Sequence, residues 1–206
     1  MSTVYQSYAF ETAPIWDAVP VGAIDRFHWE GADAYRPKSF FQLCFVKGQG
    51  VHVRLWTDET DVRAVCRSRD DPVWEDSCLE CFLEPVPGEG YLNVEMNPQG
   101  VYLSQWGASR EGRVFTKALT DLSPSVAPLP QKGGWGVSLF VPCALLTALS
   151  GRPFEAAAGR YRFCCFKCGD KTKRPHWASF APMGTNPPGF HNPACFAHLH
   201  IEENQP

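Results

Sequence analysis

The sequence predicts an all-β fold, an antiparallel β-sandwich with one short helix, built as a single domain over residues 1–206. Short segments of alternating apolar and polar residues recur along the chain, and 18 Pro and 17 Gly residues are scattered between them. This pattern is typical of many short strands joined by turns. A chain of 206 residues can bury a sizeable core, and no repeat, linker or change in composition divides it.

The helix and most of the strands can be assigned from local patterns. Residues 40–46 and 51–57 alternate on either side of a Gly-containing turn and are predicted to form a hairpin. Residues 142–149 are predicted to form the helix, because Pro142 suits its first turn and Gly151 follows its end. Together the segments give roughly seven to ten strands, as expected of a β-sandwich. The remaining strands are predicted at residues 101–106, 134–141, 159–167 and 195–201.

A second hairpin, of residues 76–84 and 91–97, has one apolar face and one face of acids, amides and aromatic residues. The register that matches the two apolar faces places Glu80 opposite Glu95. Directly opposed side chains lie about 4.5–5.5 Å apart at Cβ, and like charges at that distance are destabilising. We therefore expect a cation, a shared proton, a basic side chain or a hydroxyl-rich ligand to compensate.

Composition excludes several classes of function. The net charge of −3 and the lack of an extended basic segment argue against a nucleic-acid partner. No stretch approaches the roughly 20 apolar residues of a membrane span, so no membrane partner is expected. The N-terminus lacks the features of a secretory signal, and nine cysteines fit buried thiols. Both observations favour a cytoplasmic location.

Two Cys-x-x-Cys motifs, Cys78 to Cys81 and Cys165 to Cys168, each resemble half of a zinc site. Residues three apart on a strand face opposite sides of the sheet. Neither motif is therefore expected to chelate a metal within an unbroken strand, although Cys168 stands at a predicted strand end. Buried structural thiols are the expected role.

A calcium site is the other metal hypothesis. Asp70, Asp71 and Asp76 lie close together in the sequence, and carboxylate oxygens are the ligands that calcium prefers. The segment has no EF-hand spacing, and Asp before Pro is also an ordinary turn signal. These three residues are the candidate metal ligands, with calcium as the candidate cofactor.

Several segments resemble the family 9 carbohydrate-binding modules and their relatives, which have an immunoglobulin-like or DOMON-like β-sandwich fold. The resemblance covers most of the chain after residue 10 and supports the predicted fold. The segments that carry it are Val73–Phe82, Tyr91–Gly100, Phe166–Asp170, Pro175–Trp177 and Pro188–Pro193, together with Phe196.

In that family, two tryptophans sandwich a terminal glucose unit, while acids, amides and an arginine bind its hydroxyls, and structural calcium is common. The resemblance implies that Trp74 and Trp177 are the stacking platforms and that Glu80 is the acid. It also implies hydroxyl-binding roles for Asn97 and Lys167, and the predicted register adds Glu95. The expected function is non-catalytic binding of a mono- or oligosaccharide.

Two alternatives remain open. Glu80 and Glu95 could serve a glycoside hydrolase or a hydrolase-associated protein, because retaining glycosidases hold two carboxyl groups about 5–5.5 Å apart. The chain could instead be an intracellular interaction domain that kept the sandwich and does not bind sugar. A cleft between Trp74 and Trp177 would favour a ligand, whereas a flat, filled face would not.

Overall fold

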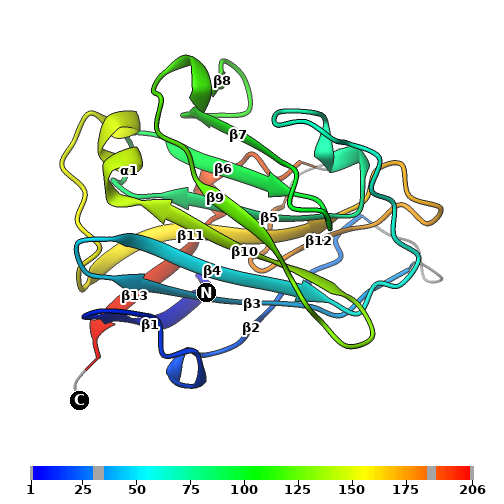
Figure 1. The fold of residues 1–206 in the computed structure, drawn as a ribbon, viewed down its shortest axis with the longest axis horizontal. Coiled ribbons are helices and arrows are strands. Elements are labelled where there is room, and N and C mark those ends of the chain that lie inside the picture. Colours follow the sequence, from blue (N-terminus) through cyan, green and yellow to red (C-terminus); the bar gives the residue numbers. More distant parts are fainter. Residues whose placement is uncertain (1, 30–34, 185–188, 205–206) are drawn as a thin grey trace.

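The computed structural model describes residues 2–29, 35–184 and 189–204; Pro188, which begins one of the resembling segments, lies outside these ranges. Over the described residues the chain forms thirteen strands and one α-helix (Figure 1). The helix is α1 (Cys143–Ser150). The strands are β1 (Val4–Phe10), β2 (Gly22–Ala23), β3 (Ser39–Val46), β4 (Gly50–Thr57), β5 (Cys78–Glu84), β6 (Tyr91–Met96), β7 (Tyr102–Gly107), β8 (Val114–Phe115), β9 (Ser125–Leu129), β10 (Trp135–Pro142), β11 (Gly159–Cys168), β12 (Trp177–Ser179) and β13 (Ala197–Glu203).

The strands form one curled sheet in the order β8-β7-β6-β5-β11-β13-β1-β3-β4-β10-β9, with β12 paired to β11 and β2 to β3. The curl brings the layer of β9, β10, β4 and β3 in front of β6, β5 and β11 (Figure 1). A single large hydrophobic cluster includes Val53 and Leu139 from one layer and Leu79 and Val94 from the other. The predicted β-sandwich is thus confirmed.

Strand β1 was not predicted, and it makes the sheet mixed rather than purely antiparallel. It lies between β13 and β3 and pairs in parallel with both. The alternation of apolar and polar residues indicates a strand but not its direction. A parallel arrangement therefore cannot be recognised from the pattern alone.

The other predicted elements are present, with small shifts at their ends. The hairpin at residues 40–57 is β3 and β4, and Val51, Val53 and Leu55 face the core as expected. Helix α1 begins after Pro142 and ends at Ser150; Gly151 follows it with a φ of 67°, the left-handed conformation that favours glycine at a helix end.

The predicted register of the second hairpin is confirmed: Glu80 lies opposite Glu95 in the antiparallel β5–β6 pair. The polar face of this hairpin is largely covered, however, because every residue of β5 and β6 is buried. Aromatic side chains from the C-terminal region cover part of this face. Among them, His191 stacks on Phe82, with ring centroids 4.8 Å apart.

A buried ionic network joins β11 to the opposite layer. Lys167 Nζ lies 3.0 Å from Glu59 Oε2 and donates to His176 Nε2 at 2.7 Å. Glu59 also accepts hydrogen bonds from Trp135 Nε1 on β10 and from Ser77 Oγ. Burial and the charge of Lys167 lower the pKa of His176 to about 4. This imidazole is therefore neutral near pH 7, and its Nε2 can accept a hydrogen bond from the Lys167 ammonium.

Removing one partner of this network should strongly destabilise the fold. Lys167→Met leaves the Glu59 carboxylate buried without its cation, which typically costs about 3–5 kcal/mol of unfolding free energy. Urea unfolding of wild type and variant measures the difference. Lys173→Met is the matched control, because Lys173 is exposed and pairs with Asp61 at the surface. Equal effects of the two substitutions would contradict the structural role of Lys167.

Candidate functional site

A cavity of about 430 Å³ opens over the polar face of β5, β6 and the end of β11. Its size falls within the range of ligand pockets, about 300–1,000 Å³. The lining combines aromatic rings with acidic, basic and amide side chains. It consists of Trp74, Glu80, Glu95, Leu103, Gln105, Arg110, Arg113, Phe115, Cys168, Asp170, Trp177, Gly189, Phe190 and His191.

The two predicted indole platforms, Trp74 and Trp177, both line this cavity. Trp74 lies in a 3-10 turn, Val73–Glu75, and remains 38% exposed. Trp177 begins β12 and donates from Nε1 to Asp170 Oδ1 at 2.7 Å. The Asp170 amide in turn donates to the Trp74 carbonyl at 3.1 Å. Asp170 therefore holds both tryptophans in place, one through its side chain and one through its backbone.

The two predicted acids lie on the floor of the cavity. Glu80 is 2% exposed and Glu95 is 4% exposed. Glu95 Oε1 accepts a hydrogen bond from Asn93 Nδ2 at 3.0 Å, whereas its Oε2 has no hydrogen-bond partner among the described residues. A buried polar atom without a partner costs about 1–3 kcal/mol. A ligand hydroxyl reaching this oxygen would remove that cost.

The environment of the two acids favours their protonated forms. Burial and the charge of Glu95 raise the pKa of Glu80 well above its ordinary value. Burial also raises the pKa of Glu95, to about 7, although the positive charge of Arg113 opposes this shift. Near neutral pH the pair therefore holds a proton and does not carry two full charges. Shared protonation and a basic side chain are two of the compensations expected for this register.

Arg113 is a pocket residue that sequence reasoning missed. It donates from Nε to Gln105 Oε1 at 3.2 Å and from Nη1 to the Arg110 carbonyl at 2.7 Å. A Cβ on Gly107 would lie 2.8 Å from Arg113 Cγ, so this glycine leaves room for the arginine. Arg113 lies between β7 and β8 in a segment that showed no regular pattern, and nothing in the sequence indicated that it reaches the cavity.

Residues near the C-terminus form another wall. His191 Nδ1 and Tyr91 Oη lie 2.9 Å apart in a hydrogen bond, and Phe190 stacks on Phe166 with ring centroids 4.3 Å apart. Burial, together with the charges of Arg113 and Arg110, lowers the pKa of His191 to about 3. The ring is therefore neutral and acts as a flat, weakly polar surface rather than as a cation.

The other two predicted hydroxyl partners are placed outside the cavity lining. Lys167 lies opposite Leu79, which puts it on the core face, in the buried network described above. Strand β6 ends at Met96, so Asn97 begins a turn and donates to Asp76 Oδ2 at 3.1 Å. Both side chains are fully buried. Both therefore make structural contacts within the protein, and ligand contact by either side chain stays a prediction.

The three candidate calcium ligands are not brought together. Asp70 pairs with Lys117 at 2.8 Å, and Asp71 accepts two backbone N–H groups of its own turn. Asp76 accepts from the amides of Val65 and Cys66. Burial raises the pKa of Asp76, but these hydrogen bonds outweigh it, and the net shift is downward. Because each carboxylate is occupied by donors of this chain, the three residues do not fit a shared calcium site.

The fold and its cavity define a β-sandwich protein with an aromatic-walled pocket over one face of the sheet. The chain belongs to carbohydrate-binding family 9, whose family model matches residues 14–201. The family expected from the sequence is thereby confirmed. None of the curated proteins matches the chain. Among the described residues, no helix is both long and apolar enough to span a membrane.

Solved structures share the fold at low sequence identity. One is a protein from Bacteroides uniformis with a suggested carbohydrate-binding role: it is 24% identical, has a TM-score of 0.81, and the match covers 98% of this chain and 100% of that one. A family 9 module from Caldicellulosiruptor kristjanssonii was solved with cellotriose: it is 12% identical, has a TM-score of 0.63, and the match covers 98% of this chain and 95% of that one. A family 9 module from the same organism was also solved with glucose: it is 12% identical, has a TM-score of 0.57, and the match covers 97% of this chain and 97% of that one.

The raised pKa of Glu95 predicts how stability depends on pH. Unfolded Glu95 loses its proton near its ordinary pKa of 4.5, whereas the folded protein keeps it to about pH 7. Between these values the folded state binds more protons, so the unfolding free energy falls as pH rises. Glu95→Gln removes this loss. We compare the unfolding free energy of the variant minus that of wild type at two pH values. This difference should be about 1–3 kcal/mol larger at about pH 8 than at about pH 5.

Urea unfolding at several pH values, in buffer containing a chelator, measures this difference. Glu202→Gln is the control, because Glu202 is exposed on β13 and its replacement should leave the pH profile of wild type unchanged. A difference between Glu95→Gln and wild type that stays constant across the pH range would contradict the burial of a shared proton at this pair.

Proposed function

We propose that the cavity binds a glucose unit of a mono- or oligosaccharide without catalysis. Trp74 and Trp177 provide the stacking surfaces, and Glu80, Glu95 and Arg113 provide the hydroxyl partners. The observation that carries the proposal is the unpartnered Glu95 Oε2, a buried acceptor on the floor of a cavity with indoles in its lining.

The chemistry of the lining matches the two kinds of surface on a sugar ring. A pyranose has apolar C–H faces, which suit indole rings, and an edge of hydroxyl groups, which suits charged and amide side chains. Ligand sites generally combine an apolar surface with a few polar groups that set the orientation. The carboxyl groups can accept or donate according to protonation, and Arg113 can only donate, so the floor can satisfy hydroxyls in either role.

The family supports the choice of ligand class. The module from Caldicellulosiruptor kristjanssonii was solved with glucose and with cellotriose, and the present chain shares its fold. Glucose and short glucans are therefore the first sugars to test. An aromatic site of this kind suggests modest affinity, in the micromolar to millimolar range, or about −8 to −4 kcal/mol.

Loss of one indole should weaken sugar binding. Trp74→Ala removes a stacking surface from the mouth of the cavity, and we expect affinity for glucose and cellotriose to fall at least about 10-fold, equivalent to about 1.4 kcal/mol. Isothermal titration calorimetry measures it. Because Trp74 is partly exposed, the substitution should leave the fold intact, which circular dichroism can check.

Trp56→Ala is the matched control for that experiment. Trp56 stacks on Phe40 with ring centroids 5.8 Å apart, on β4 and away from the cavity lining. This variant should bind sugar as wild type does. Equal affinities of wild type and Trp74→Ala for every sugar that binds would rule out the proposed site.

A hydrolytic role has one observation in its favour, the pair of opposed acids with raised pKa values. Glycosidases need an acid of this kind, but their two carboxyl groups flank the scissile bond. Here both acids project from neighbouring strands of one floor, which favours binding over cleavage. Turnover of an aryl glycoside by wild type, abolished in Glu80→Gln, would reverse this preference.

A further inference from the structure

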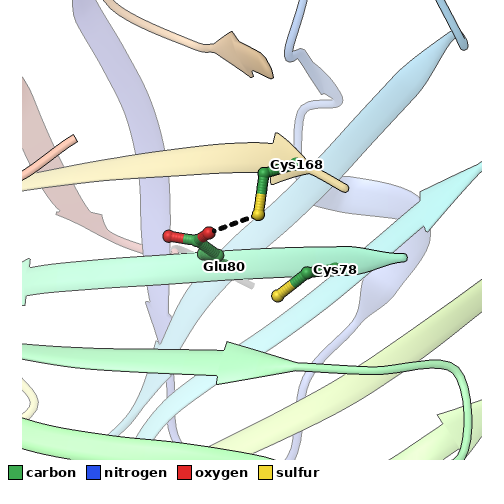
Figure 2. Close-up of side chains that lie close together, drawn as sticks. All are labelled: Cys78, Glu80 and Cys168. Carbon is green, nitrogen blue, oxygen red and sulfur yellow. Dashed lines mark hydrogen bonds between the residues drawn. The ribbon is translucent and has the colours of Figure 1, made fainter. Parts of the chain in front are cut away.

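The two Cys-x-x-Cys motifs meet across the β5–β11 pair. The antiparallel register sets Cys78 opposite Cys168 and Cys81 opposite Cys165. Residues that are two positions apart on a strand lie on the same face of the sheet, so Glu80 lies on the same face as Cys78. One cysteine of each motif and one glutamate therefore lie close together (Figure 2), and two of the three, Glu80 and Cys168, line the cavity.

The three side chains are close enough to share one ion. A sulfur of Cys78, a sulfur of Cys168 and a carboxylate oxygen of Glu80 all lie within 4.8 Å of one another. Figure 2 shows the Cys168 thiol pointing from β11 toward the Glu80 carboxylate on β5, to which it donates at 2.9 Å. Among the described residues, this is the one group of three potential metal ligands that meets this spacing.

We propose that Cys78, Glu80 and Cys168 form a zinc site in the floor of the cavity. Two thiolates and a carboxylate suit Zn²⁺, which binds sulfur at about 2.3 Å and carboxylate oxygen at about 2.0–2.2 Å. Calcium and magnesium prefer sets made of oxygen alone. On binding, the metal displaces the two thiol protons and the proton that Glu80 shares with Glu95, and all three pass to solvent.

The surroundings of the cluster favour a bound cation. All three residues are nearly fully buried, yet Glu80 and Cys168 line the cavity, which provides a path for entry. Glu95 lies opposite Glu80, and its Oε2 has no hydrogen-bond partner among the described residues. A water that enters from the cavity supplies the fourth ligand and completes the four-coordinate geometry that zinc prefers. Glu95 Oε2 can accept a hydrogen bond from that water or from a sugar hydroxyl.

The second cysteine pair provides an internal comparison. Cys81 and Cys165 face each other in the same register on the opposite face of the sheet, and both pairs are buried in the same hydrophobic cluster. That pair belongs to no group of three ligands among the described residues. The two pairs thus differ in whether a carboxylate accompanies them, and only Cys78 with Cys168 should bind zinc.

Cobalt substitution tests the proposal with the metal itself as the probe. Reduced full-length protein, stripped of metal with a chelator, is titrated with Co²⁺ under anaerobic conditions. We expect one equivalent to bind, with a thiolate-to-cobalt charge-transfer band and visible bands of tetrahedral cobalt, and Zn²⁺ to displace both. Absence of the charge-transfer band would overturn the proposal, because sites without sulfur do not produce it.

Matched variants locate the site. Cys168→Ala should weaken metal affinity by more than about 100-fold, since removing a partner that only orients a ligand already costs about 10–100-fold. Cys165→Ala, on the other face of the same strand, should keep wild-type affinity. Equal binding by both variants would overturn the assignment.

X-ray absorption of zinc-loaded wild type needs no variant and keeps the proposal testable if Cys168→Ala does not fold. Two sulfur atoms at about 2.3 Å are expected, and a shell of oxygen and nitrogen alone would overturn the proposal. None of these readouts involves sugar, so failure of the proposed carbohydrate binding would leave this test unaffected.

Discussion

The antiparallel register of β5 with its two neighbours determines which side chains face the cavity and which face the core. Pairing with β6 sets Glu80 opposite Glu95, and pairing with β11 sets Cys78 opposite Cys168. A shift of one residue in either pair would place the acids in the core. The apolar faces of these strands therefore position the site, because burying them selects one register.

Adjacent positions on β11 illustrate how sharply the two faces differ. Cys168 lines the cavity, while Lys167 reaches into the core and joins Glu59 and His176. A buried ion pair of this kind adds little net stability, although losing one partner is costly. The network ties β11 to the layer of β10 through Trp135. It thus keeps in place the strand that brings Cys168 to the cavity floor.

Local patterns were sufficient to predict the sandwich, the helix and the Glu80–Glu95 register, because each depends on alternation or turn residues. The family resemblance singled out the two indoles, and both line the cavity. Local patterns were insufficient where a contact joins distant segments. Arg113 lies in an irregular segment, and the lining by residues 189–191 depends on tertiary packing. The Cys78–Cys168 pair needed the β5–β11 register, which could have been inferred only by pairing the two Cys-x-x-Cys motifs in antiparallel order.

The central claim is that a sugar enters the cavity between Trp74 and Trp177, above the buried acids. The most direct measurement follows the indole N–H signals of the seven tryptophans in ¹⁵N-labelled wild type by NMR as glucose or cellotriose is added. The account predicts that the signals of Trp74 and Trp177 move saturably with sugar while those of Trp16 and Trp56, outside the cavity lining, stay in place. Saturable shifts confined to Trp16 or Trp56, or no shift of any indole, would contradict it.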